Sequence, residues 1–185
     1  LTTSSRNALE ASGYKWPEPY THELAAYVQP EECNPRGCNL TPALERAESA
    51  CALELAGAPG NRALTGCRFI FPAGDHRITR TIRTCRAHTY EGRGGAHRRA
   101  QTTITATVGV WHGQGFGTCG GSAAGAITVR HLGLIFPSGP HAEPIVGIHA
   151  EAKVHIESVW MIYADLGVWI TADVSRTPKS NANAY

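Results

Sequence analysis

The sequence contains no apolar run that approaches the roughly 20 residues of a membrane-spanning helix, which argues against a membrane span. Charged residues are sparse at 17%, and only three of them are lysines. Surfaces that bind nucleic acids are rich in basic side chains interleaved with aromatic ones, so the composition also argues against a nucleic-acid partner. Aspartate is equally scarce, the three being Asp75, Asp165 and Asp173. A catalytic aspartate cluster or an Asp-rich calcium loop therefore has few candidates.

Cysteine, by contrast, is abundant, with six in the chain. Such a number is typical of proteins from an oxidising compartment, so we expect a secreted, extracellular or cell-surface protein. Cys33 and Cys38 bracket a turn-rich loop that they could close, and the other pairings stay open. The disulfide candidates are Cys33, Cys38, Cys51, Cys67, Cys85 and Cys119. Asn39 begins a glycosylation sequon, for which N-capping of a helix by Thr41 is the competing interpretation.

The length of 185 residues suits one compact domain, and 20 glycines with 11 prolines indicate many turns. Residues 1–38 are predicted to form an N-terminal arm with a small Cys loop and a short helix near residues 22–28. Residues 39–185 open with a clearer signal, in which Thr41 is an N-cap and Pro42 the first helical residue. The helix of about 15 residues that follows is amphipathic. Its apolar positions are Leu40, Leu44, Ala47, Cys51 and Leu55.

After Gly66 the pattern changes to short β-rich runs, and no second long helical pattern follows. One helix followed by many short strands argues against a doubly wound α/β fold. We expect strands over residues 67–71, 77–85, 88–91, 102–110, 126–136, 145–150, 153–163 and 166–172.

An internal repeat marks the last third of the chain. At an offset of 27 residues, the segment that starts at Ile127 aligns with the one that starts at Val154, and apolar residues meet apolar residues at six positions. At an offset of 20, Val146-Gly147-Ile148 aligns with Leu166-Gly167-Val168. Repeats of this length built from short strands are typical of a β-solenoid, in which each turn stacks on the one before.

The helix, the strand Phe69-Ile70-Phe71, the turn Pro72-Ala73-Gly74 and the glycine turn over residues 90–95 resemble the N-terminal pattern of the pectate-lyase-like (pectin lyase fold) superfamily. The resemblance covers roughly residues 41–172. It implies an all-β, right-handed parallel β-helix (solenoid) with an N-terminal arm and a capping α-helix. No segment after residue 172 resembles a second cap. We therefore expect residues 39–185 to hold only the first turns of the solenoid, from a longer chain or from a protomer whose end a partner covers.

The resemblance implies a domain that acts on or binds an acidic polysaccharide, as a polysaccharide lyase or glycoside hydrolase does. The catalytic candidates are Arg130, as the base of a lyase, with Glu157 and Asp165 as the best carboxylate pair. The repeat places Arg130 beside Glu157, so a cross-strand ion pair is the competing interpretation. Calcium is the cofactor that such lyases use, but no oxygen-rich loop marks a calcium site, and no other cofactor or metal is indicated.

Aromatic and basic side chains are the candidates for substrate binding, because flat rings stack on sugars and arginine attracts their acidic groups. They are Trp160, Trp169, Tyr163 and Arg93. The positive charge lies in residues 62–99, where nine arginines face two acidic residues, a net charge of +7. Arg77, Arg80, Arg83 and Arg86 recur every three residues, and strand alternation would scatter them over both faces of a sheet.

A rival function is a non-catalytic structural module of an extracellular fibre, spike or cell-surface assembly, in which the arginine segment docks a neighbouring protein chain. The scarcity of aspartate favours this module, whereas the aromatic residues favour a glycan partner. His112, His131, His149 and His155 follow no zinc-binding spacing and are interpreted as ordinary strand histidines.

Overall fold

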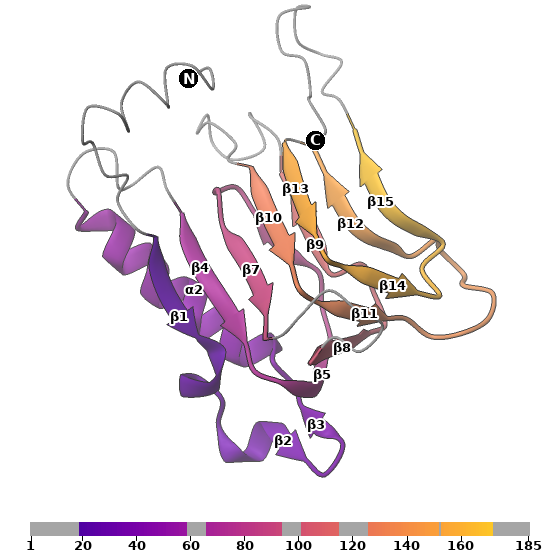
Figure 1. Ribbon diagram of the computed structural model, residues 1–185, viewed down its shortest axis with the longest axis horizontal. Coiled ribbons are helices and arrows are strands. Elements are labelled where there is room, and N and C mark those ends of the chain that lie inside the picture. The colour runs from indigo at the N-terminus through magenta and orange to yellow at the C-terminus, as the bar shows by residue number, and fades with distance from the viewer. Residues whose placement is uncertain (1–18, 59–65, 94–100, 115–125, 152, 172–185) are drawn as a thin grey trace, which may run out of the picture.

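The computed structural model describes residues 19–58, 66–93, 101–114, 126–151 and 153–171. In these ranges the chain is mostly β, with three parallel sheets, one antiparallel hairpin and one long helix (Figure 1). Sheet 1 contains β1 (Tyr20–Glu23), β4 (Cys67–Phe71), β7 (Thr89–Gly92), β10 (Ile127–Arg130) and β13 (Val154–Glu157), in that order. Sheet 2 contains β5 (Gly74–Ile78), β8 (Thr102–Ala106), β11 (Gly133–Ile135) and β14 (Trp160–Ile162). Sheet 3 contains β6 (Ile82–Thr84), β9 (Trp111–Gly113), β12 (Val146–Ala150) and β15 (Leu166–Ile170).

The connectivity is solenoid-like. Three consecutive strands, such as β4, β5 and β6, form one coil of the chain, with one strand in each sheet. The three strands of the next coil pair beside them in parallel. The predicted repeat is confirmed as strand register, because Ile127 pairs with Val154 and Ile148 pairs with Val168. The two offsets differ because the connection from β11 to β12 is longer than the connection from β14 to β15.

The predicted long strands are wrong at the sheet corners. Residues 126–136 form β10 and β11, and residues 153–163 form β13 and β14. The turn residues His131 and Ser158 lie one repeat apart, with φ angles of 58° and 52°. This left-handed conformation turns the chain from sheet 1 into sheet 2.

The same correction applies to the arginine segment. Residues 77–85 were expected to form one strand that scatters its arginines over two faces, but the chain turns a corner between β5 and β6. Arg77, Arg80, Arg83 and Arg86 are consequently all exposed. Ile78 and Ile82 occupy the inward positions of the two strands, so the core stays apolar while the arginine side chains face solvent.

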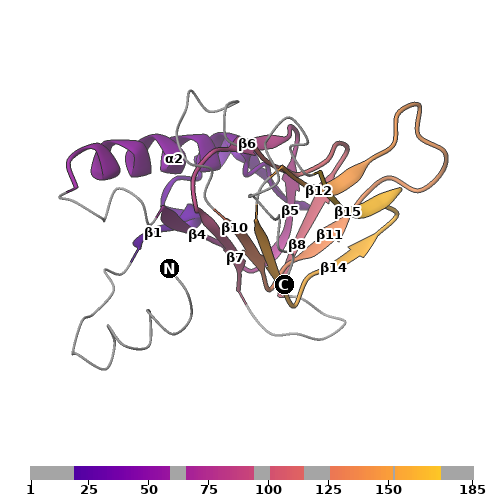
Figure 2. The same ribbon diagram turned by 90° about the horizontal axis from the view of Figure 1, so that it is seen from above.

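Helix α2 (Thr41–Ala56) confirms the predicted helix. It packs against β1 and β4, the first strands of sheet 1, and lies away from β15 (Figure 2). Its buried face contains Leu44, Ala47, Cys51 and Leu55. The predicted cap is displaced by one residue, because Leu40 is the N-cap and Thr41 already belongs to the helix. The hydroxyl of Thr41 instead accepts the Thr79 backbone N–H at 2.9 Å, and the Asn39 side chain accepts the Thr41 N–H at 3.2 Å.

The segment before the helix departs from the expected arm. Tyr20–Glu23 is the edge strand β1 and pairs in parallel with β4, and a 3-10 turn, η1 (Leu24–Ala26), replaces the predicted short helix. A second 3-10 turn, η2 (Pro30–Glu32), leads into the hairpin of β2 (Cys33–Asn34) and β3 (Gly37–Cys38). The expected Cys33–Cys38 disulfide closes that hairpin. Most of the predicted arm, residues 1–18, lies outside the described residues.

The core lies between the three sheets and is built around a run of buried rings. Phe69 stacks on Tyr90 with ring centroids 5.4 Å apart, and Tyr90 contacts Trp111 at 5.5 Å. All three side chains are almost fully buried. A second disulfide, Cys51–Cys67, joins helix α2 to β4 at the edge of this core. Among the described helices, none is long and apolar enough to cross a membrane.

Candidate ligand-binding face on sheet 3

The outward surface of sheet 3 carries one column of polar and aromatic side chains. Arg83, His112, His149 and Trp169 occupy paired register positions on β6, β9, β12 and β15. Their neighbours along the strands, Ile82, Trp111 and Ile148, point into the core and are buried. Because side chains alternate between the two faces of a strand, burying these neighbours forces the column outward.

Three rings of this column form a continuous stack. The imidazoles of His112 and His149 have centroids 4.3 Å apart at an interplanar angle of 19°. The ring of His149 stacks in turn on the indole of Trp169, at 4.7 Å and 16°. These separations match the spacing of about 4.8 Å between parallel strands, so the sheet itself sets the stack. Trp169 is 47% exposed and offers a ring to solvent.

Hydrogen bonds hold the two imidazoles in place. His112 Nε2 donates to Glu151 Oε1 at 2.8 Å, and His149 Nε2 lies 3.0 Å from Thr171 Oγ1. Glu151 is itself fixed by its backbone N–H, which donates to the Gly113 carbonyl at 2.8 Å. Burial, with the neighbouring His112 as a smaller cause, lowers the pKa of His149, and Glu151 opposes the shift only in part. The shift favours the neutral form of the His149 ring.

The arginine end of the column adjoins a cleft between helix α2 and β6 of about 250 Å³, which Arg80, Arg83, Glu45 and Glu48 help to line. Arg80 forms an ion pair with Glu45. Glu48 lies deeper, where the Tyr90 hydroxyl donates to its Oε1 at 3.1 Å. Burial raises the pKa of Glu48 to about 7, against the smaller lowering effects of Tyr90 and Arg80. The cleft therefore combines exposed positive charge with a carboxyl that is half protonated at neutral pH.

Arg130 and Glu157, the predicted pair, occupy opposite positions on neighbouring strands, but their side chains do not pair with each other. Their Cα positions are partners across β10 and β13. The Arg130 guanidinium turns to the preceding coil, where Nη2 lies 2.7 Å from Glu91 Oε2, so the expected ion pair with Glu157 is wrong in its partner. Arg68 donates to the same carboxylate oxygen at 2.8 Å. Partial burial would raise the pKa of Glu91, but the hydrogen bonds from the two arginines outweigh it and hold that pKa low.

Asp165 lies apart from that pair, at the corner between β14 and β15. Its Oδ2 accepts the Ile145 backbone N–H at 2.7 Å and lies 2.7 Å from His141 Nδ1. These two hydrogen bonds lower the pKa of Asp165, and the bond from the Ile145 backbone has the larger effect. The carboxylate thus fastens the β11–β12 connection to the next coil. The structure does not bring Asp165 together with Arg130 and Glu157.

The predicted substrate-binding residues are dispersed. Trp160 is half-buried at a corner of sheet 2, and a Cβ on Gly133 would meet its indole at 2.6 Å, so the ring packs flat on that glycine. Tyr163 is 59% exposed in the turn after β14. Arg93 Nη2 lies 2.7 Å from Glu23 Oε1 beside sheet 1. Of the four, Trp169 alone joins the column on sheet 3.

Sequence reasoning missed His112, His149 and Glu151 as a group. The offset of 20 residues does place His149 over Trp169, and this signal was present in the repeat. His112 and His149 are separated by a connection of irregular length, so no repeat aligned them. The few lysines and aspartates in the chain gave no sign of the group either, because it consists of two histidines and one glutamate.

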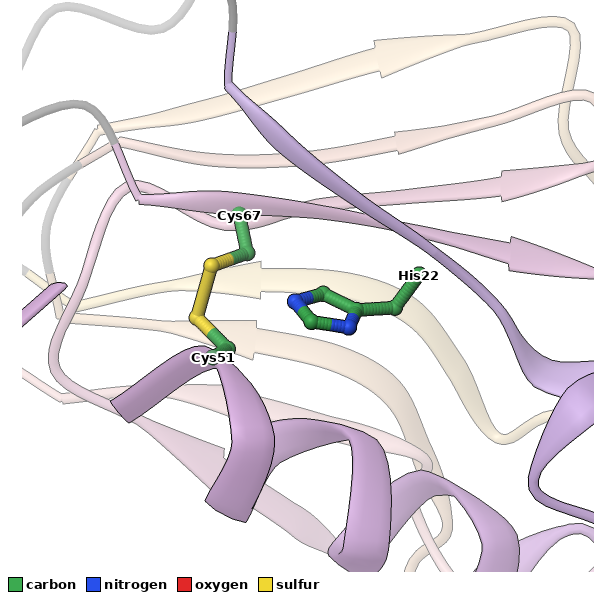
Figure 3. A group of neighbouring side chains, drawn as sticks. All are labelled: His22, Cys51 and Cys67. Carbon is green, nitrogen blue, oxygen red and sulfur yellow. A yellow bond between two sulfur atoms is a disulfide. The ribbon is translucent and has the colours of Figure 1, made fainter. Parts of the chain in front are cut away.

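A second group of potential ligands lies in the core, where His22 faces Cys51 and Cys67 (Figure 3). The two sulfurs form a disulfide, so they are not available as thiolate ligands. His22 is instead a packing residue, with Nδ1 2.8 Å from the Tyr27 hydroxyl and its ring stacked on Phe69 at 5.5 Å.

The sheet 3 column thus unites, among the described residues, an exposed indole, imidazole hydrogen-bonding groups and positive charge. The indole of Trp169 can stack on an apolar ring face of a ligand, while the polar and positive groups of the column can hydrogen-bond the ligand's hydroxyls and attract its acidic groups. No protein-family model, curated protein or solved structure matches the chain.

Proposed function

We propose that the chain is a secreted domain of the pectate-lyase-like type, a right-handed parallel β-helix, which binds an acidic polysaccharide along the outward face of sheet 3. The observation that carries the proposal is the alignment of the exposed Trp169 ring, the two imidazoles and Arg83 in one column. Three strand spacings separate its ends, a span of about 14 Å. A ligand of that length contains more than one sugar ring.

The chemistry of the two ends suits a uronate or a similarly charged sugar. Trp169 offers a flat apolar ring, on which the C–H face of a pyranose stacks. Arg83 and Arg80 lie at the opposite end, and a guanidinium can form two parallel hydrogen bonds to one carboxylate. Electrostatic attraction also raises the rate at which a polyanion finds the face.

Secretion is supported by the disulfides. Cys33–Cys38 and Cys51–Cys67 are both closed, and Cys85 is also disulfide-bonded. Such a use of cysteine is typical of an oxidising compartment. The proposal is for binding rather than cleavage, because Arg130, Glu157 and Asp165 do not converge on one another.

A panel of polysaccharides tests the proposal. Affinity electrophoresis or calorimetry would compare polygalacturonate and alginate with uncharged dextran, at low and at high salt. We expect an acidic glycan to bind, dextran to bind much more weakly, and salt to weaken the acidic complex. Arg83→Ala should weaken binding, whereas Arg36→Ala, which removes an exposed arginine from the distant Cys hairpin, should not. Equal binding of dextran, or equal effects of both arginine variants, would contradict the proposal.

The structural module is retained as a second candidate because of one observation on β15. Leu166, Val168 and Ile170 are 47%, 41% and 37% exposed, although Val168 pairs with the fully buried Ile148. Exposed apolar groups of this kind mark protein interfaces. Light scattering of the wild type and of Val168→Ser would distinguish the two functions, because the module predicts an assembly that the serine weakens.

A further inference from the structure

The residues His112, His149 and Glu151 form a compact group of potential metal ligands on sheet 3. Each offers one ligand atom, and the three atoms lie within 4.8 Å of one another. The group is partly exposed, so an ion can reach it from solvent. His112 and His149 are register partners on β9 and β12, and Glu151 directly follows β12.

The backbone holds the three donors on one rigid patch. The parallel pairing of β9 with β12 fixes the two histidines, and the Glu151 N–H bond to the Gly113 carbonyl extends the same ladder. A zinc ion binds nitrogen and oxygen at about 2.0 to 2.2 Å, which places two tetrahedral ligands about 3.4 Å apart. The most distant donors therefore need to approach by up to about 1.4 Å, whereas His112 Nε2 and Glu151 Oε1, 2.8 Å apart, need to separate slightly. The two stacked imidazoles also need to turn out of their near-parallel arrangement, because a metal lies in the plane of each ring that binds it. Side-chain rotations of these partly exposed residues can supply both movements.

The chemistry of the donors selects the class of ion. Two imidazoles and one carboxylate suit a divalent transition metal, whereas calcium and magnesium prefer oxygen ligands alone. Thr171 Oγ1, 3.0 Å from His149 Nε2, is placed to orient that ring or to contact a metal-bound water.

We infer that His112, His149 and Glu151 bind one Zn²⁺ ion, with a fourth position left open to water. In the bound form the His112 ring carries its single proton on Nδ1, so that the Nε2 lone pair exchanges its hydrogen bond with Glu151 for a bond to the metal. Three protein ligands with an open position are the arrangement that lets zinc contact an exchangeable ligand. This inference concerns the metal alone and does not depend on glycan binding.

The test is a zinc titration of the untagged chain, without glycan, against a chromophoric chelator. We expect one Zn²⁺ per chain, and a loss of affinity of about tenfold or more in each of His112→Ala, His149→Ala and Glu151→Gln. The matched control is His155→Ala, which removes an exposed histidine from sheet 1 and should leave the affinity unchanged. Cobalt supplies a second measurement, because a tetrahedral Co²⁺ site absorbs visible light and the three variants should lose that band.

Circular dichroism in EDTA would show that each variant keeps its fold before titration. Failure of the wild type to bind zinc would overturn the inference, and so would undiminished affinity in any one of the three variants. A chain that binds zinc but no acidic glycan would refute the proposed function and leave the zinc site standing. The reverse result would refute the zinc site alone.

Discussion

The imidazole of His149 lies flat against the indole of Trp169, with ring centroids 4.7 Å apart and an interplanar angle of 16°. The two residues are 20 positions apart in sequence and partners in register, so the stack follows directly from the pairing of β12 with β15. Core aromatic residues of this chain stack in the same way, but Trp169 does so on the outside, where a ligand can extend the stack.

Glu48 should make the stability of the protein fall as pH rises. Its pKa is about 7 in the folded chain against 4.5 ordinarily, so ionisation is harder in the folded state. Stability is therefore lost between pH 4.5 and 7, by about 3 kcal/mol. In urea unfolding series, Glu48→Gln should gain about that amount relative to the wild type over this window.

The matched control for Glu48 is Glu45→Gln, which removes a carboxylate from the preceding turn of helix α2. Its ion pair with Arg80 is largely exposed, so we expect a change below about 1 kcal/mol at every pH. A difference between Glu48→Gln and the wild type that stays constant from pH 4.5 to 7 would refute the role of Glu48.

His88 should act in the opposite direction. Burial, with Arg86 as a smaller cause, lowers the pKa of His88 to about 4, and its Nδ1 accepts the Cys67 N–H at 3.0 Å. Protonation is thus disfavoured in the folded state, and stability falls by about 3 kcal/mol as pH drops from 6.5 to 4. His88→Asn, which keeps an acceptor, should remove this loss relative to the wild type. His155→Asn is the exposed control, and equal curves for the two variants would rule the assignment out.

Glu91 should matter more for stability than Glu157. The Glu91 side chain is 14% exposed and accepts hydrogen bonds from both Arg68 and Arg130. Glu91→Gln leaves two adjacent guanidinium groups without their carboxylate, which should cost about 1 to 2 kcal/mol in urea unfolding. Glu157→Gln changes an exposed residue and should cost less than about 0.5 kcal/mol. The reverse order would restore the predicted Arg130–Glu157 pair.

The Cys51–Cys67 disulfide should contribute strongly to stability because it joins helix α2 to the core. The cysteines are 16 residues apart in sequence, and closing such a loop stabilises a protein by about 3 kcal/mol in the chain-entropy account. A Cys51→Ala, Cys67→Ala double variant should therefore melt several degrees lower than the wild type in calorimetry. The Cys33–Cys38 double variant is the control, since its bond spans 5 residues in an exposed hairpin. Equal melting temperatures for the two variants would contradict this account.

The sequence predicted the parts of the fold that repeat regularly. Ile127 and Val154 align by their apolar pattern alone, because inward positions of stacked strands must all be buried. The corners at His131 and Ser158 were not predicted, since an apolar pattern can continue through a turn whose residues also point inward. Leu132 and Val159, which follow these corners, show that continuity.

The candidate site was harder to predict than the fold because it combines coils of unequal length. Arg130 was placed beside Glu157 correctly, yet its guanidinium selects Glu91 from the coil on the other side. His112 and His149 are register partners, but the sequence spacing between them matches neither of the two repeats. Trp169 was predicted as a sugar-stacking residue from its type and strand position, but its imidazole neighbours follow only from the register.

Titration of an acidic oligosaccharide into the wild type, Trp169→Ala and Leu53→Ala tests the central claim most directly. Leu53 is an exposed apolar residue on helix α2, 78% exposed, and serves as the matched control. The account predicts that Trp169→Ala weakens binding by about tenfold, the loss of about 1.4 kcal/mol of ring stacking. It also predicts that Leu53→Ala binds like the wild type. Undiminished binding by Trp169→Ala would contradict it.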